Sequence, residues 1–348
     1  MRISMPLQYA GDPKAAVDQV IELEKVGLDT VWVAEVYGFD APTLMGYIAA
    51  RTETVQIGSA ILPLYTRTPT LIAMTAAGLD DLSGGRAILG LGASGPQVIE
   101  GFHGVPYVKP LARTRETIEI CRKVWRREER LTHDGAVFQL PLPAERGTGL
   151  GKPLKIINHP VRSEIPVYVA SLGVKNVAMT AEIADGWLPH LFIPEKAHTV
   201  WGEALAEGRA KRDASLGELE VSAGGLLAIG EGEDTKRLLD LVRPMIALYV
   251  GGMGAKGKNF YNTVARRYGY EEAAEKIQDL YLAGKKDEAA AAVPEEFVEL
   301  TNMVGPESYV RERVEAFRAA GVTRLNVIPV GEDPVALIEK VKGWASST

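Results

Sequence analysis

Short apolar runs and amphipathic helical segments alternate along the chain, and this alternation restricts the fold more than any other feature. Each run is rich in β-branched and aromatic residues, and a segment with helical periodicity follows it. The runs occupy residues 2–7, 30–35, 55–61, 87–92, 166–171, 186–191, 220–230 and 324–330. Strands buried on both faces of a parallel sheet have this continuous apolar character. Eight consecutive units predict an α/β fold, a (β/α)8 TIM barrel, rather than an open doubly wound sheet.

Two longer segments interrupt the alternation. Residues 128–165 follow the fourth unit and are rich in Gly and Pro, whereas residues 251–303 follow the seventh strand and have mostly helical character. We expect both to be insertions, after strand 4 and strand 7, in a single barrel domain spanning residues 1–348. The aromatic residues near the start of the second insertion, among them Phe260 and Tyr261, either cover the substrate or pack within the insertion, and we favour packing.

Composition excludes several classes of protein. The chain has 348 residues, of which 46% are hydrophobic and 24% charged, as in ordinary globular proteins. No apolar run reaches the roughly 18 residues of a membrane span, and the start is too polar for a signal peptide, which predicts a cytoplasmic protein. The net charge of −6 disfavours nucleic-acid binding. A single cysteine, Cys121, and five histidines without ligand spacing predict no disulfide and no metal site.

The stretch AILGLGASG contains Gly90, Gly92 and Gly95 in the spacing G-x-G-x-x-G. In a Rossmann fold this fingerprint joins the first strand to a helix. Here it ends the fourth strand, Pro96 follows it, and the next clear helical pattern begins only near Arg113. We therefore interpret these glycines as the end of a barrel strand rather than as a dinucleotide fingerprint.

Active sites of TIM barrels lie at the carboxyl ends of the strands. Small residues gather there after strands three, four and five, in the stretches GSAIL, GLGASG and ASLGVKN. Backbone this bare lets a flat ring approach, and a helix N-terminus there suits a phosphate. A nucleophile elbow, G-x-S-x-G, is absent from the sequence. These features favour a planar, phosphorylated cofactor that carries the chemistry itself.

Four collinear segments, residues 23–35, 55–95, 165–189 and 304–327, resemble the bacterial-luciferase-like superfamily, which includes methylenetetrahydromethanopterin reductase. The resemblance is strongest to the branch that uses coenzyme F420. It implies an oxidoreductase that transfers a hydride between C5 of the deazaflavin and an organic small molecule, and a homodimer. An FMN-dependent luciferase-like monooxygenase is the first alternative, and a non-catalytic F420- or flavin-binding protein is the second.

The resemblance also implies roles for residues at the strand ends. A non-prolyl cis peptide is expected at Ala60–Ile61, behind the cofactor ring. The phosphate loop maps to the end of strand five, and the ribityl chain or ring edge to the end of strand four. The expected cofactor-binding residues are Ser59, Ala60, Ile61, Gly92, Ala93, Ser94, Gln97, Ala170, Ser171, Leu172, Gly173 and Asn176.

Three residues are candidates for catalysis, each with a structural alternative. Glu35, after strand two, is an acid or base, or else an ion-paired residue of the rim. Tyr37 binds substrate or packs, and His190, after strand six, donates a proton or is a satisfied structural histidine. Many F420 relatives have Asp-His after strand two, where this chain has Glu35 and Val36. The methanopterin reductases have a glutamate in strand one, where this chain has Pro6, and this difference disfavours methanopterin reduction.

Overall fold

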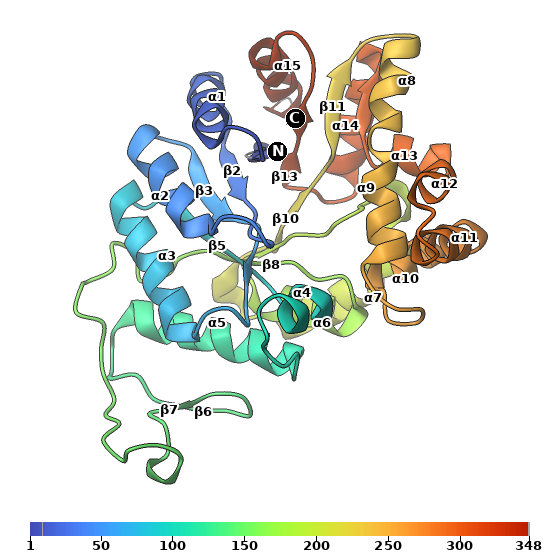
Figure 1. The fold of residues 1–348 in the computed structure, drawn as a ribbon. Coiled ribbons are helices and arrows are strands. Elements are labelled where there is room, and N and C mark those ends of the chain that lie inside the picture. The colour runs from blue at the N-terminus through green and yellow to red at the C-terminus, as the bar shows by residue number, and fades with distance from the viewer. Residues whose placement is uncertain (9, 347–348) are drawn as a thin grey trace.

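The computed structural model describes residues 1–8 and 10–346, and its core is a closed barrel of parallel strands (Figure 1). The barrel strands, in order around the ring, are β1 (Arg2–Pro6), β2 (Thr30–Val33), β3 (Gln56–Ser59), β5 (Ala87–Gly92), β8 (Val167–Val169), β9 (Gly186–Trp187), β10 (Glu220–Ala223) and β13 (Arg324–Asn326). Pairing of β13 with β1 closes the ring, since Arg2 lies opposite Arg324. The predicted TIM barrel is confirmed.

Helices surround the barrel and bury one face against it. They are α1 (Pro13–Lys25), α2 (Ala41–Arg51), α3 (Pro69–Ser83), α5 (Pro110–Arg126), α6 (Val174–Ile183), α7 (Pro194–Lys211), α14 (Glu307–Ala319) and α15 (Pro334–Ser346). In α1, for example, Val17, Val20 and Leu23 recur at helical spacing and are fully buried. A 3-10 turn, Ala214–Leu216, leads into β10.

Short strands extend the barrel at its carboxyl end. The strand β4 (Leu62–Pro63) continues strand three and pairs with the end of β5. A small sheet of β12 (Met303–Gly305), β11 (Leu226–Ile229) and β14 (Ile328–Pro329) continues strands seven and eight. The mouth of the barrel is therefore a raised rim.

Both insertions are present after the expected strands. The first contains a hairpin of β6 (His133–Asp134) and β7 (Gln139–Leu140) and a 3-10 turn, Ala144–Arg146. The second begins earlier than the expected residue 251, directly after β11. It contains α8 (Glu233–Asp240), α9 (Arg243–Ala247), a π-helix (Leu248–Gly252), α10 (Phe260–Arg267), α11 (Glu271–Leu282), α12 (Lys286–Ala291) and α13 (Glu295–Leu300). Figure 1 shows them on opposite sides of the barrel, the hairpin at lower left and α8–α13 at right. The single-domain interpretation stays a prediction.

One expectation about the fourth strand is wrong. A helix, α4 (Pro96–Gly101), begins directly after Gly95, where Pro96 was taken as a break. Proline is well tolerated at the first position of a helix, because its missing N–H has no intrahelical partner there and its φ suits the helix. The Rossmann interpretation still fails, since the sheet is closed.

Two large aromatic rings fill the barrel beneath its mouth. Trp32 and Tyr168 are each 1% exposed, with ring centroids 5.3 Å apart, and Ile88 packs against them. A Cβ on Gly58 would lie 2.2 Å from the Trp32 ring. Gly58 is therefore small to admit Trp32, and not, as we expected, to admit a flat ligand. The plug leaves the carboxyl-end rim as the place for a ligand.

Within the described residues, no helix is long and apolar enough to cross a membrane, and no three His, Cys, Asp or Glu side chains are grouped as metal ligands.

Candidate active site

The ends of strands three, four and five meet at one part of the rim. The peptide bond Ala60–Ile61 is cis, as expected. A Cβ on Gly92 would lie 2.5 Å from Cδ1 of Ile61 and 3.5 Å from Cβ of Ala170, so these three residues are neighbours. Ala60, Ile61 and Ala170 are partly exposed, as is Ala93. The structure thus brings together small and apolar residues from three predicted segments.

Two predicted site residues have side chains that are already engaged. Ser59 is fully buried; its Oγ donates to the Gly90 carbonyl at 2.8 Å and accepts from the Gly90 N–H at 2.9 Å. Ser171 is 4% exposed, and its Oγ lies 2.8 Å from Thr180 Oγ1. Both hydroxyls join neighbouring elements, so these residues could contribute only main-chain groups to a ligand.

The helices after strands four and five begin differently from those after the first three strands. Asp12, Asp40 and Thr68 cap α1, α2 and α3 with side-chain hydrogen bonds. By contrast, α4 and α6 follow Gly95 and Gly173, which have no capping side chain. The first N–H groups of a helix have no intrahelical partner, and together with the helix dipole they attract anions.

The first turn of α6 has a second anion-binding feature. Asn176 has a buried Oδ1 without a hydrogen-bond partner. Because the two ends of an amide group are exchangeable in assignment, this position can equally present an N–H. The turn contains no acidic residue, and Lys175 is exposed beside it. Trp201 Nε1 donates to the Leu172 carbonyl at 2.8 Å and holds the preceding loop in place. These groups fit a phosphate.

The end of strand four forms a turn that faces α4. Ser94 has a φ of 58°, in the left-handed region that few non-glycine residues adopt. Its carbonyl accepts a hydrogen bond from the Tyr107 hydroxyl at 3.2 Å. Gln97 is exposed on α4, next to Gly95. This turn keeps Ser94 and Gln97 at the rim.

Both carboxylate oxygens of Glu35 are occupied. Arg67 donates from Nη1 to Oε1 and from Nη2 to Oε2, the latter at 2.9 Å, and the Ala41 N–H donates to Oε2 at 2.8 Å. The Glu35 and Arg67 side chains are only 10% and 14% exposed. This geometry favours the ion-paired alternative, in which Glu35 joins the loops after strands two and three and caps α2.

His190 is not a satisfied structural histidine. Its Nε2 is buried and has no hydrogen-bond partner. The ring centroid lies 4.2 Å from that of Tyr249 and 5.8 Å from that of Tyr261. Burial lowers the pKa of His190 to about 4, so the imidazole is neutral at pH 7. A neutral imidazole can accept or donate one hydrogen bond.

Tyr37 lies at the outer edge of the mouth, 66% exposed, with its ring centroid 6.3 Å from that of Phe102. The sequence interpretation missed Tyr249, which belongs to the π-helix, and for Tyr261 it favoured packing over a position above the substrate. No local pattern marks Tyr249, because its contact with His190 exists only after the second insertion has folded over the rim.

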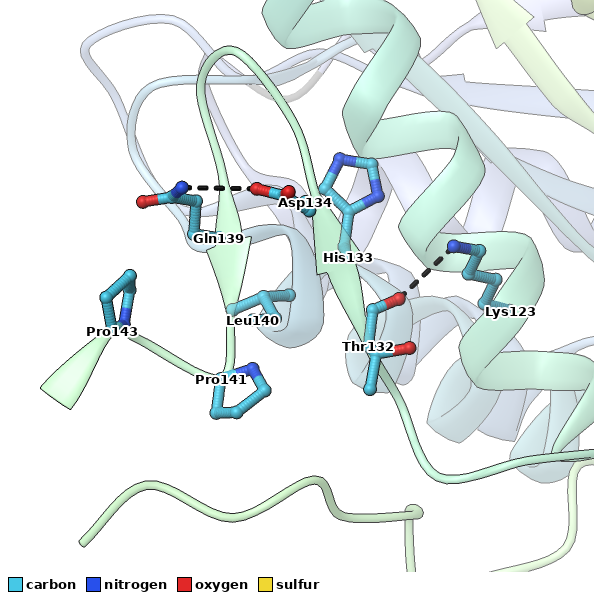
Figure 2. A pocket seen from close by; sticks show the side chains of 8 residues that line it. All are labelled: Lys123, Thr132, His133, Asp134, Gln139, Leu140, Pro141 and Pro143. Carbon is cyan, nitrogen blue, oxygen red and sulfur yellow. Dashed lines mark hydrogen bonds between the residues drawn. The ribbon is translucent and has the colours of Figure 1, made fainter. Parts of the chain in front are cut away.

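Two cavities lie elsewhere. One of about 330 Å³, drawn in Figure 2, lies between the β6–β7 hairpin and Lys123 of α5. The other, of about 200 Å³, lies at the opposite end of the barrel beside Arg324 and Glu220. No predicted site residue lines either cavity. They carry no argument for the active site.

The protein is a closed α/β barrel whose mouth, with bare strand ends and uncapped helix starts, fits a phosphorylated ring. The model of the luciferase-like monooxygenase family matches residues 1–324, and the chain belongs to this family. It is accordingly an enzyme, which sets aside the non-catalytic alternative.

The comparisons give three informative relatives. The chain is 44% identical over 331 residues, 94% of each chain, to "Putative coenzyme F420-dependent oxidoreductase Rv3520c" of Mycobacterium tuberculosis. The structure of the coenzyme F420-dependent tetrahydromethanopterin reductase from Methanopyrus kandleri matches 98% of this chain and 96% of its own, with a TM-score of 0.77 and 24% identity. The structure of a Baeyer-Villiger monooxygenase from Pseudomonas putida, in complex with FMN, matches 99% of this chain and 98% of its own. Its TM-score is 0.64 and its identity 19%. The two structures establish the fold alone.

Proposed function

We propose that the protein is a coenzyme F420-dependent oxidoreductase that acts on an organic small molecule. The observation that carries this proposal is the 44% identity, over 94% of both chains, to a relative named for that cofactor. The geometry supports it, because the uncapped start of α6 and the unpartnered amide of Asn176 fit the cofactor's phosphate. The homodimer and the cytoplasmic location stay predictions.

In this proposal the protein binds the cofactor, orients the substrate and shields both from water. Ala60, Ile61 and Ala170 support the ring, while Gly173 and Asn176 hold the phosphate. When bound, the deazaflavin supplies hydride exchange at C5. His190, Tyr249 and Tyr261 stand over the mouth, and the second insertion excludes water from it.

The FMN-dependent monooxygenase remains the alternative, because the family model and one neighbour's FMN complex fit it. Equilibrium titration of the purified protein with coenzyme F420 and with FMN separates the two. We expect F420 to bind more tightly than FMN, with binding measured by the change in cofactor fluorescence. We also expect turnover without O₂ consumption. Tight binding of FMN alone, with O₂ consumed on turnover, would refute the proposal.

The variant Asn176→Asp tests the phosphate site. A carboxylate there should repel the cofactor phosphate and raise the Kd for F420 at least about tenfold. The helix N-terminus favours the same charge by about 0.3–1 kcal/mol, which offsets part of the cost of burying one carboxylate oxygen, and circular dichroism checks that the variant is folded. Asn158→Asp, on the exposed first insertion, makes the same charge change as a control. Equal affinity of the two variants for F420 would place the phosphate elsewhere.

A further inference from the structure

The second insertion brings two phenol groups to His190 without using their hydroxyls. The Tyr249 and Tyr261 rings contact each other, with centroids 4.7 Å apart, and each contacts the His190 ring. Within the described chain, the hydrogen bonds of both tyrosines are made by the main chain, from Asn259 Nδ2 to the Tyr249 carbonyl and from the Tyr261 N–H to Asn259 Oδ1. Both tyrosine side chains are partly exposed, and His190 Nε2 is buried without a hydrogen-bond partner. Three polar groups therefore remain available at one place.

Buried amides fix this arrangement. Asn259 is 2% exposed; besides the two bonds above, its Nδ2 donates to the Val250 carbonyl at 3.0 Å. Asn262 Nδ2 donates to the carbonyls of Val250 and Ala274, at 3.1 and 2.8 Å. The π-helix that contains Tyr249 is thus joined to α10, which contains Tyr261. Such π-helical turns occur frequently at functional sites.

The tyrosine pair faces the rim where the cofactor residues meet. Phe260, next to Tyr261, places its ring 3.0 Å from where a Cβ on Gly173 would stand, in the phosphate loop. Burial first, and then the hydroxyls of Tyr249 and Tyr107, raise the pKa of Tyr261. Tyr107 is the residue that donates to the Ser94 carbonyl after strand four. The pair therefore lies at the mouth between the loop after strand five and His190 after strand six.

The chemistry presented there is neutral. Burial raises the pKa of Tyr249, with a smaller contribution from Tyr37, so both phenols stay protonated at pH 7. In the described chain, no cation lies over the rings of His190, Tyr249 or Tyr261. Glu35, the acid at the end of strand two, is paired with Arg67. A buried carboxylate or phosphate of a substrate would find no counter-charge among these groups, and its desolvation would go uncompensated.

We propose that the hydroxyls of Tyr249 and Tyr261 bind the carbonyl or hydroxyl oxygen of a neutral substrate whose apolar body packs against the aromatic rings. This rests on the proposed function, because it places that oxygen above the cofactor. The pair determines specificity, admitting ketones, aldehydes or alcohols and rejecting carboxylated or phosphorylated molecules. His190 completes the site as a neutral hydrogen-bonding partner.

Matched probes test the proposal without turnover. Three probes share one aromatic body. Acetophenone has a neutral carbonyl oxygen, 4-acetylbenzoate adds a negative carboxylate, and ethylbenzene has no oxygen. Binding to the protein, with and without oxidised F420, is followed by ligand-observed NMR. We expect acetophenone to bind at least tenfold more tightly than 4-acetylbenzoate. Equal binding of the two, or binding of neither, would overturn the proposal.

Variants locate the contact. Tyr249→Phe and Tyr261→Phe should each weaken acetophenone binding about 3- to 10-fold, as expected for loss of one hydrogen bond, and leave ethylbenzene unaffected. The control Tyr281→Phe changes a ring that packs behind the π-helix on Gly251 and Gly252, and it should alter neither affinity. Acetophenone binding that is unchanged in both tyrosine variants contradicts the assignment.

Failure of this inference is distinguishable from failure of the proposed function. If F420 does not bind to the wild-type protein, the cofactor proposal falls. Acetophenone binding to the cofactor-free protein, and its loss in the tyrosine variants, still decides the role of the pair. If F420 binds and the tyrosine variants retain acetophenone affinity, only the inference about the pair falls.

Discussion

The barrel mouth has a floor, formed by the ends of strands two to five, and a cover, formed by His190, Tyr249 and Tyr261. The polar groups of these two regions are satisfied in opposite ways. In the floor, Ser59 exchanges two hydrogen bonds with Gly90, and Glu35 is held by Arg67. In the cover, His190 Nε2 has no partner, and the Tyr249 and Tyr261 hydroxyls have none among the described residues. The floor is therefore a fixed main-chain surface, whereas the cover retains hydrogen-bonding capacity for a ligand.

This difference separates two tasks. Where the side chains of Ser59 and Glu35 are already paired, the floor can support a ring by its shape alone, while Asn176 after strand five keeps an unpaired amide. A cover built from an insertion can change its side chains without disturbing the barrel. We infer that substitutions in the floor mainly reduce stability, and that substitutions in the cover mainly alter binding and titration.

The largest effect is expected from Gly90→Ala. The new Cβ would lie 1.8 Å from the Ser59 carbonyl oxygen, a backbone atom inside the barrel wall that has little room to move. Overpacking of this kind typically costs 1–3 kcal/mol, and here we expect about 3 kcal/mol or more. Urea unfolding followed by circular dichroism measures the loss.

Gly78→Ala is the matched control. Gly78 lies on the exposed face of α3, and a Cβ there meets no atom within 4 Å. Alanine is the better helix former, so this variant should gain about 0.5–1 kcal/mol. If Gly90→Ala is as stable as Gly78→Ala, strands three and four do not contact each other as described.

A smaller effect is expected from the titration of His190. Its pKa is about 4 in the folded protein and 6.5 ordinarily, so the unfolded chain takes up a proton first as the pH falls. The contribution of His190 to the free energy of unfolding should thus be fully present above pH 6.5. It should be lost as the pH falls from 6.5 to 4. Since the residue is partly exposed, we expect a loss of about 2 kcal/mol. Denaturation at a series of pH values measures it.

The variant His190→Gln removes this titration and should flatten the pH dependence in that interval. His198→Gln, on the exposed face of α7, should keep the slope of the wild type. An unchanged slope in His190→Gln would show that the imidazole is solvated in the folded protein and that the cover is more open than the structure shows.

The floor could be predicted from the sequence, because its signals are local. Continuous apolar runs identify the strands, and the order of strands around a barrel follows the order in the chain. The prediction therefore reached Ile61, Gly92 and Ala170, which do meet. The sequence did not explain why residue 58 is a glycine. Gly58 makes room for Trp32, which lies on the neighbouring strand, and that contact exists only in the folded barrel.

The cover could not be predicted in the same way. Tyr249 meets His190 only because buried amides of Asn259 and Asn262 join the π-helix to α10. These are tertiary contacts inside an insertion without barrel periodicity, so neither spacing nor composition indicates them. The sequence likewise left Glu35 with two possible roles, since Arg67 comes from a different loop.

The smallest of these effects is expected from Glu35→Gln, which decides between those two roles. The variant keeps the shape and the bond from Ala41 N–H but leaves Arg67, 14% exposed, without its charge partner. Loss of a fully buried partner costs 3–5 kcal/mol and of an exposed one less than about 1, so a loss of about 1–2 kcal/mol is expected here. Arg67→Ala completes a double-mutant cycle with it. If Glu35 is a link between loops, the double variant is hardly less stable than either single one, and the pH dependence of turnover keeps its shape. An acid–base role predicts the reverse, with near-wild-type stability, a large loss of kcat and a missing limb in the pH profile. That outcome would show that Glu35 takes part in the reaction and is not only a structural link within the floor.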